Sequence, residues 1–155
     1  MLRAAVQADL AYLSDLYATT RAEELAWAGW PKVVGDAFLG NQFELQHRHF
    51  VETDGATDCW IIERRSEPIG RLYLDRRGPV WRILDIALLP EWQGRGIGGT
   101  LLEWTTMSAR AAKADGVDLH VLASNPRAAA LYKRLGFVAT ETGTPTHRHM
   151  VWRVS

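Results

Sequence analysis

Hydrophobic positions recur at helical spacing in the first third of the chain. The first set follows Asp9, a residue type that is common at a helix N-cap, and predicts a helix. Its members are Leu10, Leu13, Leu16 and Tyr17. A short strand over residues 2–5 precedes this helix. A second helical region begins after Arg21, is interrupted at residues 29–31, and resumes from Lys32 towards Val51.

The pattern changes to strands in the middle of the chain. Residues 59–63 and 69–74 are rich in strand-forming residues, and the turn residues 66–68 between them predict a β-hairpin. After a further turn at Gly78–Pro79, the mostly apolar run 80–89 predicts a third strand.

The second half alternates helices and strands. A helix is expected from about Gly99 to Ala114, closed by Asp115–Gly116 as a C-cap. Val117, Leu119 and Val121 alternate with Asp118 and His120, which predicts a strand with one buried face.

The last part of the chain predicts one more helix and two strands. Asn125–Pro126 has the residues of a helix N-cap and first turn, and this helix should stop at Gly136. Residues 137–140 and 147–154 then predict the closing strands. The order of elements indicates an α/β (α+β) domain whose central sheet is mixed and flanked by helices.

Composition limits the class of protein. The 155 residues suffice for one compact domain, so we expect a single domain over residues 1–155. Basic and acidic residues, 18 of each, balance to zero net charge, which argues against nucleic acid or an anionic membrane as the main partner. The single Cys59 cannot form an internal disulfide. With no apolar run of the ~20 residues that span a bilayer and no signal-peptide core, the sequence predicts a cytoplasmic protein.

Four glycines within six positions, Gly94, Gly96, Gly98 and Gly99, directly precede an apolar helical run. Such a cluster marks backbone that bends sharply or approaches a ligand closely, and a helix N-terminus offers unpaired N–H groups to an anion. Three of the glycines also fit the dinucleotide fingerprint G-x-G-x-x-G. That fingerprint should open a two-part domain with an acidic residue ending the next strand, whereas the next strand here ends in Ala123–Ser124.

Two longer motifs carry a family resemblance. Gln93-Gly-Arg-Gly-Ile-Gly98 resembles Q/R-x-x-G-x-G/A, the pyrophosphate loop of the GNAT (Gcn5-related N-acetyltransferase) superfamily. The segment 125–137 resembles the second block of that family, N-x-x-A-x-x-L-Y-x-x-x-G-F. The resemblance covers essentially the whole chain and is specific over residues 83–137. It implies the GNAT-like acyl-CoA N-acyltransferase fold and acetyl-CoA as co-substrate.

The resemblance also implies a set of cofactor-binding residues. These are Ile86, Ala87, Leu88, Gln93, Gly94, Arg95, Gly96, Ile97, Gly98, Gly99, Thr100, Asn125 and Tyr132. The backbone N–H of Leu88 is expected to meet the thioester carbonyl. Tyr132 is implied as the general acid that protonates the leaving thiolate, because a tyrosine keeps its proton at neutral pH. Its helical spacing also fits a core residue.

Asp85 is the candidate general base, because burying a carboxylate inside the apolar run 83–89 is unfavourable unless it has a catalytic role or a charged partner. The alternatives are an ion pair with Arg71 or Arg82, or a position at a strand edge. His47 and His49 are secondary candidates for binding the acceptor or for acting as the general base. His147 and His149 share one strand face, but with no third ligand nearby the sequence predicts no metal site.

The sequence thus predicts an acetyl-CoA-dependent N-acetyltransferase in which a primary amine attacks the thioester directly in a ternary complex. The amine belongs to a small molecule, a peptide or a protein, and an aromatic, weakly basic set lines its pocket: Trp27, Trp30, Phe43, His47 and His49. A CoA-binding sensor on the same fold is the alternative, and zero net charge argues against an enzyme acting on charged tRNA. Both a monomer and a homodimer fit the sequence.

Overall fold

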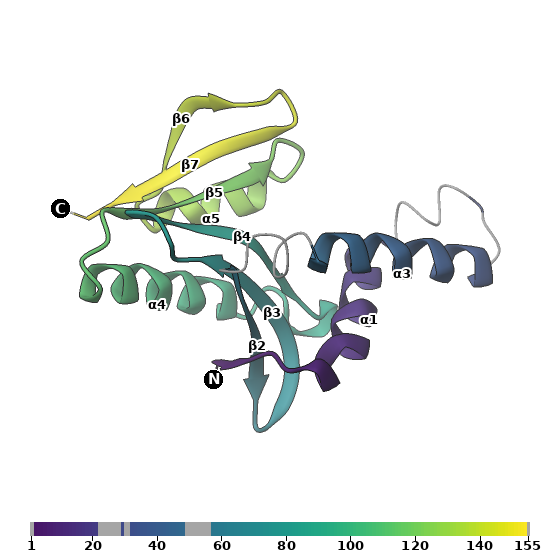
Figure 1. The fold of residues 1–155 in the computed structure, drawn as a ribbon. Coiled ribbons are helices and arrows are strands. Elements are labelled where there is room, and N and C mark those ends of the chain that lie inside the picture. The colour runs from purple at the N-terminus through teal and green to yellow at the C-terminus, as the bar shows by residue number, and fades with distance from the viewer. Residues whose placement is uncertain (1, 22–28, 30–31, 49–56, 155) are drawn as a thin grey trace. The chain divides into compact units, whose positions relative to one another are not determined.

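The computed structural model describes residues 2–21, 29, 32–48 and 57–154 (Figure 1). Its strands are β1 (Leu2–Ala4), β2 (Thr57–Arg64), β3 (Glu67–Asp75), β4 (Val80–Leu88), β5 (Gly116–Leu122), β6 (Val138–Gly143) and β7 (His147–Arg153). Its α-helices are α1 (Leu10–Thr20), α3 (Lys32–Arg48), α4 (Ile97–Ala111) and α5 (Pro126–Arg134), with short 3₁₀ turns at Gln7–Asp9 and Pro90–Trp92. No helix in the described ranges combines the length and the apolar character that crossing a membrane requires.

The strands form one sheet in the order β1-β2-β3-β4-β5-β7-β6. β4 pairs with β5 in parallel, through Val80–Ile83 and Gly116–Leu119, and β4 continues beyond this ladder to Leu88. The pairs β1–β2, β5–β7 and β6–β7 are antiparallel. This confirms the predicted mixed sheet.

The chain divides into two compact units. The N-terminal unit comprises Met1–Tyr73 and Asp85–Trp92, and the C-terminal unit comprises Leu74–Leu84 and Gln93–Ser155. β3 and β4 therefore contribute residues to both units. The predicted single domain over residues 1–155 stays a prediction.

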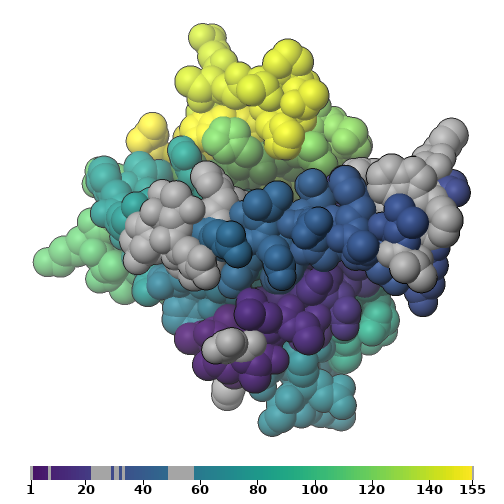
Figure 2. Space-filling model, turned by 45° about the vertical axis from the view of Figure 1, so that its right-hand side comes forward, coloured from purple at the N-terminus to yellow at the C-terminus, as the bar shows by residue number. Residues whose placement is uncertain are grey.

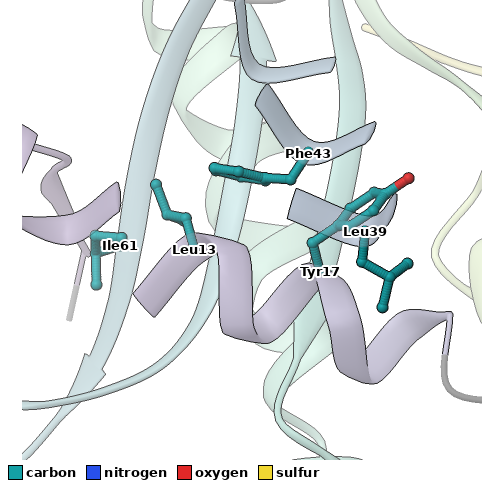
Figure 3. Packing of buried hydrophobic residues seen from close by; sticks show 5 residues of the cluster. All are labelled: Leu13, Tyr17, Leu39, Phe43 and Ile61. Carbon is teal, nitrogen blue, oxygen red and sulfur yellow. The ribbon is translucent and has the colours of Figure 1, made fainter. Parts of the chain in front are cut away.

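The core of the N-terminal unit joins α1, α3 and β2. α3 packs against α1 (Figure 2). The apolar side chains that fill the space between these elements, shown in Figure 3, are Leu13, Tyr17, Leu39, Phe43 and Ile61. Each is nearly or fully buried. Of the four apolar positions predicted for α1, Leu13, Leu16 and Tyr17 form a buried face, whereas Leu10 is 37 % exposed.

In the N-terminal unit the predicted N-cap position of Asp9 is confirmed, and one local prediction, the hairpin turn, needs correction. α1 begins after Asp9 as predicted, but the Asp9 carboxylate makes no hydrogen bond to the first turn of the helix. It accepts one from the Val6 N–H at 2.8 Å and charge-assisted hydrogen bonds from the Arg3 guanidinium. The hairpin turn is tighter than predicted: Arg65 and Ser66 have φ of 52° and 66°, as a two-residue turn requires, and β3 begins at Glu67.

The helix boundaries in the C-terminal unit are partly as predicted. α5 has Asn125 as N-cap and is followed by Gly136 with φ of 95°, which confirms both expectations. α4 starts at Ile97 and ends at Ala111, so its predicted limits of Gly99 and Ala114 were wrong. Gly116 does not cap α4 but begins β5, where a Cβ would lie 2.2 Å from the Trp152 carbonyl oxygen. The left-handed residue after α4 is Lys113, with φ of 62°.

Candidate functional site

The glycine-rich loop leads directly into the N-terminus of α4. Gly94 and Gly96 have φ of 72° and 81°, in the left-handed region that glycine favours, and Gly96 is the N-cap residue. The first intrahelical bond runs from the Thr100 N–H to the Gly96 carbonyl at 3.1 Å. The N–H groups that precede it, in the first turn of α4, have no carbonyl four residues back within the helix. Such a turn suits an anion.

Among the described residues, no neighbour gives Gly98 or Gly99 a steric reason to be glycine. Both lie in the first turn of α4, and a Cβ on either would lie 3.9 Å from a Leu131 methyl group, an ordinary van der Waals contact. In a helix, glycine is about 0.5–1 kcal/mol less favourable than alanine. A Cβ here would tilt towards the helix N-terminus, where an anion would bind. Packing within the protein therefore does not account for these two glycines, whereas the close approach of a ligand does.

Arg127 is a cation beside the loop that the sequence interpretation missed. A Cβ built on Gly94 would lie 3.3 Å from Arg127 Nη2, so this side chain of α5 reaches the loop. Arg95, which was predicted, is exposed within the loop. A guanidinium adds charge to the partial positive charge of a helix N-terminus. A basic residue in the first turn of α5, two positions after the Asn125 cap, was the signal in the sequence.

Asn125 and Tyr132 both belong to the α5 segment, as its cap and as part of the helix. The Asn125 side-chain oxygen accepts a hydrogen bond from the Ala128 N–H at 3.2 Å, which is the predicted capping contact. Tyr132 is half-buried, and its ring centroid lies 6.0 Å from that of Phe137 at an interplanar angle of 56°. The ring thus contributes to packing while part of the side chain stays accessible. The cofactor and acid roles stay predictions.

The predicted thioester-binding segment lies at the end of β4, in the N-terminal unit. Ile86, Ala87 and Leu88 are all partly exposed. Gly70 of β3 lies against them, because a Cβ there would be 2.5 Å from the Ala87 carbonyl oxygen and 2.8 Å from a Leu88 methyl group. The Leu89 N–H donates to the Ile69 carbonyl at 2.8 Å. Gly70, which the sequence did not single out, thus allows β3 to hold the end of β4 closely.

Asp85 forms an ion pair with Arg71, which was one of the predicted alternatives to a base. Arg71 Nε donates to Asp85 Oδ2 at 2.7 Å. The Arg71 side chain is 2 % exposed and the Asp85 side chain 27 % exposed. Arg82 pairs instead with Asp118, through two hydrogen bonds of 2.9 and 3.0 Å. The base role of Asp85 stays a prediction.

Aromatic side chains surround Arg71 in the N-terminal unit. Its guanidinium carbon lies 5.7 Å from the Tyr17 ring centroid and 5.6 Å from that of Tyr73. His47 Nδ1 and the buried Tyr73 hydroxyl form a 2.8 Å hydrogen bond, and the His47 ring stacks on Phe43 at 5.4 Å. Burial raises the pKa of Tyr73 above its ordinary value, so this hydroxyl keeps its proton.

A cavity of about 530 Å³ opens between α1 and α3, and Phe43 and His47 are among its lining residues. Two of the residues predicted to shape the acceptor pocket are therefore brought together. Trp27, Trp30 and His49, the other members of that set, lie outside the described residues.

The remaining histidines lie on the sheet of the C-terminal unit. His149 Nε2 is 2.9 Å from Asp118 Oδ2, and its Nδ1 is 2.7 Å from the Thr140 hydroxyl. Burial alone would raise the pKa of Asp118, but hydrogen bonds from Arg82 and His149 outweigh it and hold that pKa below its ordinary value. These partners allow the Asp118 carboxylate to be buried, although the alternation of residues along the strand predicted that it would face solvent. Within the part of the chain that the structure describes, three or more metal-ligating side chains do not gather anywhere.

Comparison with solved structures identifies the fold. The PaiA N-acetyltransferase of Thermoplasma acidophilum in complex with coenzyme A is 17 % identical, with a TM-score of 0.74 over 99 % of this chain and 98 % of that one. An acetyltransferase of Thermus thermophilus is 20 % identical, with a TM-score of 0.72 over 99 % and 96 %. The spermidine N-acetyltransferase of Vibrio cholerae in complex with CoA and spermine is 22 % identical, with a TM-score of 0.70 over 99 % and 94 %. These similarities confirm the predicted fold.

A sequence search among curated proteins gives no significant match. The family model described as "Acetyltransferase (GNAT) family" matches residues 19–137, which is more than two thirds of the chain and includes the glycine-rich loop, α4, β5 and α5. The chain belongs to the GNAT acetyltransferase family.

Proposed function

We propose that the protein is an acetyl-CoA-dependent N-acetyltransferase that moves an acetyl group to a primary amine. The observation that carries this proposal is the pair Gly98 and Gly99: the fold has room for a side chain at both positions, yet both are glycine. A pyrophosphate approaching the N-terminus of α4 accounts for them, because its oxygens accept hydrogen bonds from backbone N–H groups that a methyl group would crowd. CoA or acetyl-CoA bound to structural relatives supports the same assignment.

In this proposal the loop residues 93–100 hold the pyrophosphate mainly through backbone N–H groups. Arg95 and Arg127 supply positive charge, and the Asn125 amide contacts the pantetheine arm as well as capping α5. The negative charge of the pyrophosphate is thus met by a helix N-terminus together with two guanidinium groups.

The chemistry assigned to the remaining residues is acyl transfer by direct attack. The Leu88 N–H polarises the thioester carbonyl, so that negative charge on its oxygen is stabilised as the amine attacks. Tyr132 donates a proton to the departing thiolate. The Asp85 carboxylate attracts the ammonium form of the acceptor and accepts one proton from it, directly or through water, before the neutral amine attacks. The second proton that the nitrogen loses as the amide forms restores the Tyr132 hydroxyl through water. Collapse of the tetrahedral intermediate releases the amide and the CoA thiol.

We propose the cytoplasm as the site of the reaction, because a sequence whose single cysteine cannot form an internal disulfide suits a reducing compartment. Zero net charge favours a small amine or an exposed peptide amine over a nucleic acid as acceptor.

The experiment that tests the proposal measures release of the CoA thiol from acetyl-CoA with a panel of primary amines. Tyr132→Phe removes only the hydroxyl, so it should keep the acetyl-CoA affinity and lower kcat by about 100-fold or more, as expected for loss of a general acid. Thr106→Val is the matched control, because it removes a hydroxyl that donates to the Glu103 carbonyl within α4, and kcat should stay as in the wild type. Tight acetyl-CoA binding without turnover on any amine would identify a CoA sensor instead of an enzyme.

A further inference from the structure

An exposed histidine lies where the ladder between β4 and β5 ends. The parallel pairing of these two strands stops at Ile83 and Leu119, and the next residue of β5 is His120. β5 then runs on to Leu122, with β7 as its antiparallel neighbour on the other side. The His120 side chain is exposed. It is therefore accessible at the end of β5 where the hydrogen bonds to β4 have stopped.

His120 points to the face of the sheet opposite to α5. Val121 and its cross-strand partner Arg148 line a small cavity together with Ala129 of α5, which places α5 on the face that carries Val121. Successive side chains of a strand point to opposite faces. The ring of His120 accordingly lies on the other face, where its centroid is 5.0 Å from that of its cross-strand partner His149.

A hydrogen-bond network occupies the neighbouring ring but not that of His120. His149 Nε2 lies 2.9 Å from the Asp118 carboxylate, and His149 Nδ1 lies 2.7 Å from the Thr140 hydroxyl. An ionised carboxylate only accepts hydrogen bonds, so Nε2 carries the proton and Nδ1 accepts from the hydroxyl. Both nitrogens of His149 are thus in use. Among the described residues His120 makes no hydrogen bond, so His120 is the ring that can exchange a proton with a bound molecule.

The groups around His120 favour its neutral form. Partial burial of the ring lowers its pKa most, and the charges of His149, Arg82 and His147 lower it further, while Asp118 acts in the opposite direction. The net effect is a pKa below the ordinary value of 6.5. At neutral pH the ring therefore has one nitrogen with a free lone pair, which accepts a proton.

We propose that His120 is a further catalytic residue, which takes a proton from the acceptor nitrogen during acyl transfer. This inference rests on the proposed acetyl transfer. As the new N–C bond forms and the C–S bond breaks, Tyr132 gives its proton to the departing thiolate, and the attacking nitrogen must lose one proton to become an amide. His120 accepts that proton and passes it through water to Tyr132, so that both side chains return to their starting states.

The positions of the two side chains suit this division of roles. Tyr132 belongs to α5, on one face of the sheet, and His120 lies on the opposite face. The attacking nitrogen and the departing sulfur occupy different positions on the carbonyl carbon, so an acid and a base on opposite faces can each meet one of these two atoms. The end of the β4–β5 ladder is where the two faces are no longer separated by hydrogen-bonded strands.

The test measures kcat for CoA thiol release as a function of pH. In the wild type kcat should fall as the pH drops below 6.5, because a protonated His120 cannot accept a proton. His120→Gln should lower kcat by about 100-fold or more at neutral pH, abolish this acidic decline and keep the Kd for acetyl-CoA. His147→Gln is the matched control: it changes an exposed histidine of β7 whose Nδ1 lies 3.0 Å from the Thr146 hydroxyl, and it should keep both kcat and the pH profile.

A second variant separates proton transfer from support of the fold. His120→Ala leaves space for a free imidazole, so added imidazole should raise its kcat with increasing concentration and leave the kcat of Tyr132→Phe unchanged. A kcat of His120→Gln equal to that of the wild type, an acidic decline that persists in this variant, or no rescue of His120→Ala would each overturn the inference. If the wild type releases no CoA thiol with any amine, the proposed acetyl transfer itself fails. If the wild type turns over and His120→Gln is equally fast, only the role of His120 fails.

Discussion

Replacing Gly98 by alanine should make the protein more stable and at the same time a weaker binder of acetyl-CoA. The position is in the first turn of α4, and the nearest side-chain atom to a new Cβ is a Leu131 methyl carbon at 3.9 Å. The fold therefore accepts the methyl group, and the higher helix propensity of alanine contributes about 0.5–1 kcal/mol. For a domain of this size the midpoint of thermal unfolding should rise by about 1–4 °C.

The loss of affinity has a different origin. The new methyl group tilts towards the helix N-terminus and displaces a phosphate from at least one backbone N–H. A hydrogen bond to a charged group contributes about 1.5–3 kcal/mol, so the Kd for acetyl-CoA should rise by about 10- to 150-fold. Calorimetric titration gives the Kd, and differential scanning fluorimetry without ligand gives the change in stability.

Gly40→Ala is the matched control. Gly40 lies inside α3, and no atom in the described part of the chain is within 4 Å of its Cβ position, so alanine should stabilise the helix similarly and leave the acetyl-CoA affinity unchanged. If Gly98→Ala binds acetyl-CoA as tightly as the wild type, the glycines of this turn serve no ligand. The reasoning that leads from them to a pyrophosphate site would then be wrong.

Three further predictions concern stability. Phe43→Ala empties a site that is 3 % exposed, and urea denaturation should show a loss of about 3–5 kcal/mol, whereas a loss below about 1 kcal/mol would mean that the α1–α3 core is not packed as described. Gly116→Ala forces a Cβ to 2.2 Å from the Trp152 carbonyl and should lower the unfolding free energy by about 1–3 kcal/mol or more; an unchanged thermal midpoint would contradict the close approach of β5 and β7. The hydrogen bond from Arg3 is the main reason that the pKa of Asp9 falls from 3.8 to about 2. The stability that the ionised Asp9 contributes above about pH 4 should therefore be lost between about pH 4 and 2. Asp9→Asn should remove this part of the acid sensitivity.

Local signals in the sequence were sufficient for several elements. Asn125 followed by proline, and Gly136 at the other end, define α5 because capping and left-handed residues act within one turn of chain. The start of α4 was predicted too late for a related reason. Glycines normally oppose a helix, and here the first turn contains two that helix propensity does not explain.

Contacts between distant strands were not readable from the sequence. Asp118 was expected to face solvent, but it is buried through Arg82 of β4 and His149 of β7, and no spacing rule within β5 indicates these partners. The sequence named Arg71 and Arg82 as equal alternatives for Asp85, and only the pairing of β3 with β4 selects Arg71. The approach of Gly70 to Ala87 likewise depends on the register of two strands.

The central claim, that the loop before α4 binds the pyrophosphate of CoA, is tested most directly by titration calorimetry of acetyl-CoA into the wild type and Gly96→Glu. No atom of the described residues lies within 4 Å of a Cβ at Gly96, so the new side chain enters the space assigned to the phosphates and adds a negative charge. Its φ of 81° also disfavours any side chain, so Gly96→Asn, which tolerates this conformation, serves as the uncharged control. The account predicts binding to the wild type that disappears in Gly96→Glu while circular dichroism shows an intact fold. Absence of binding to the wild type, or equal affinity for both proteins, would contradict it.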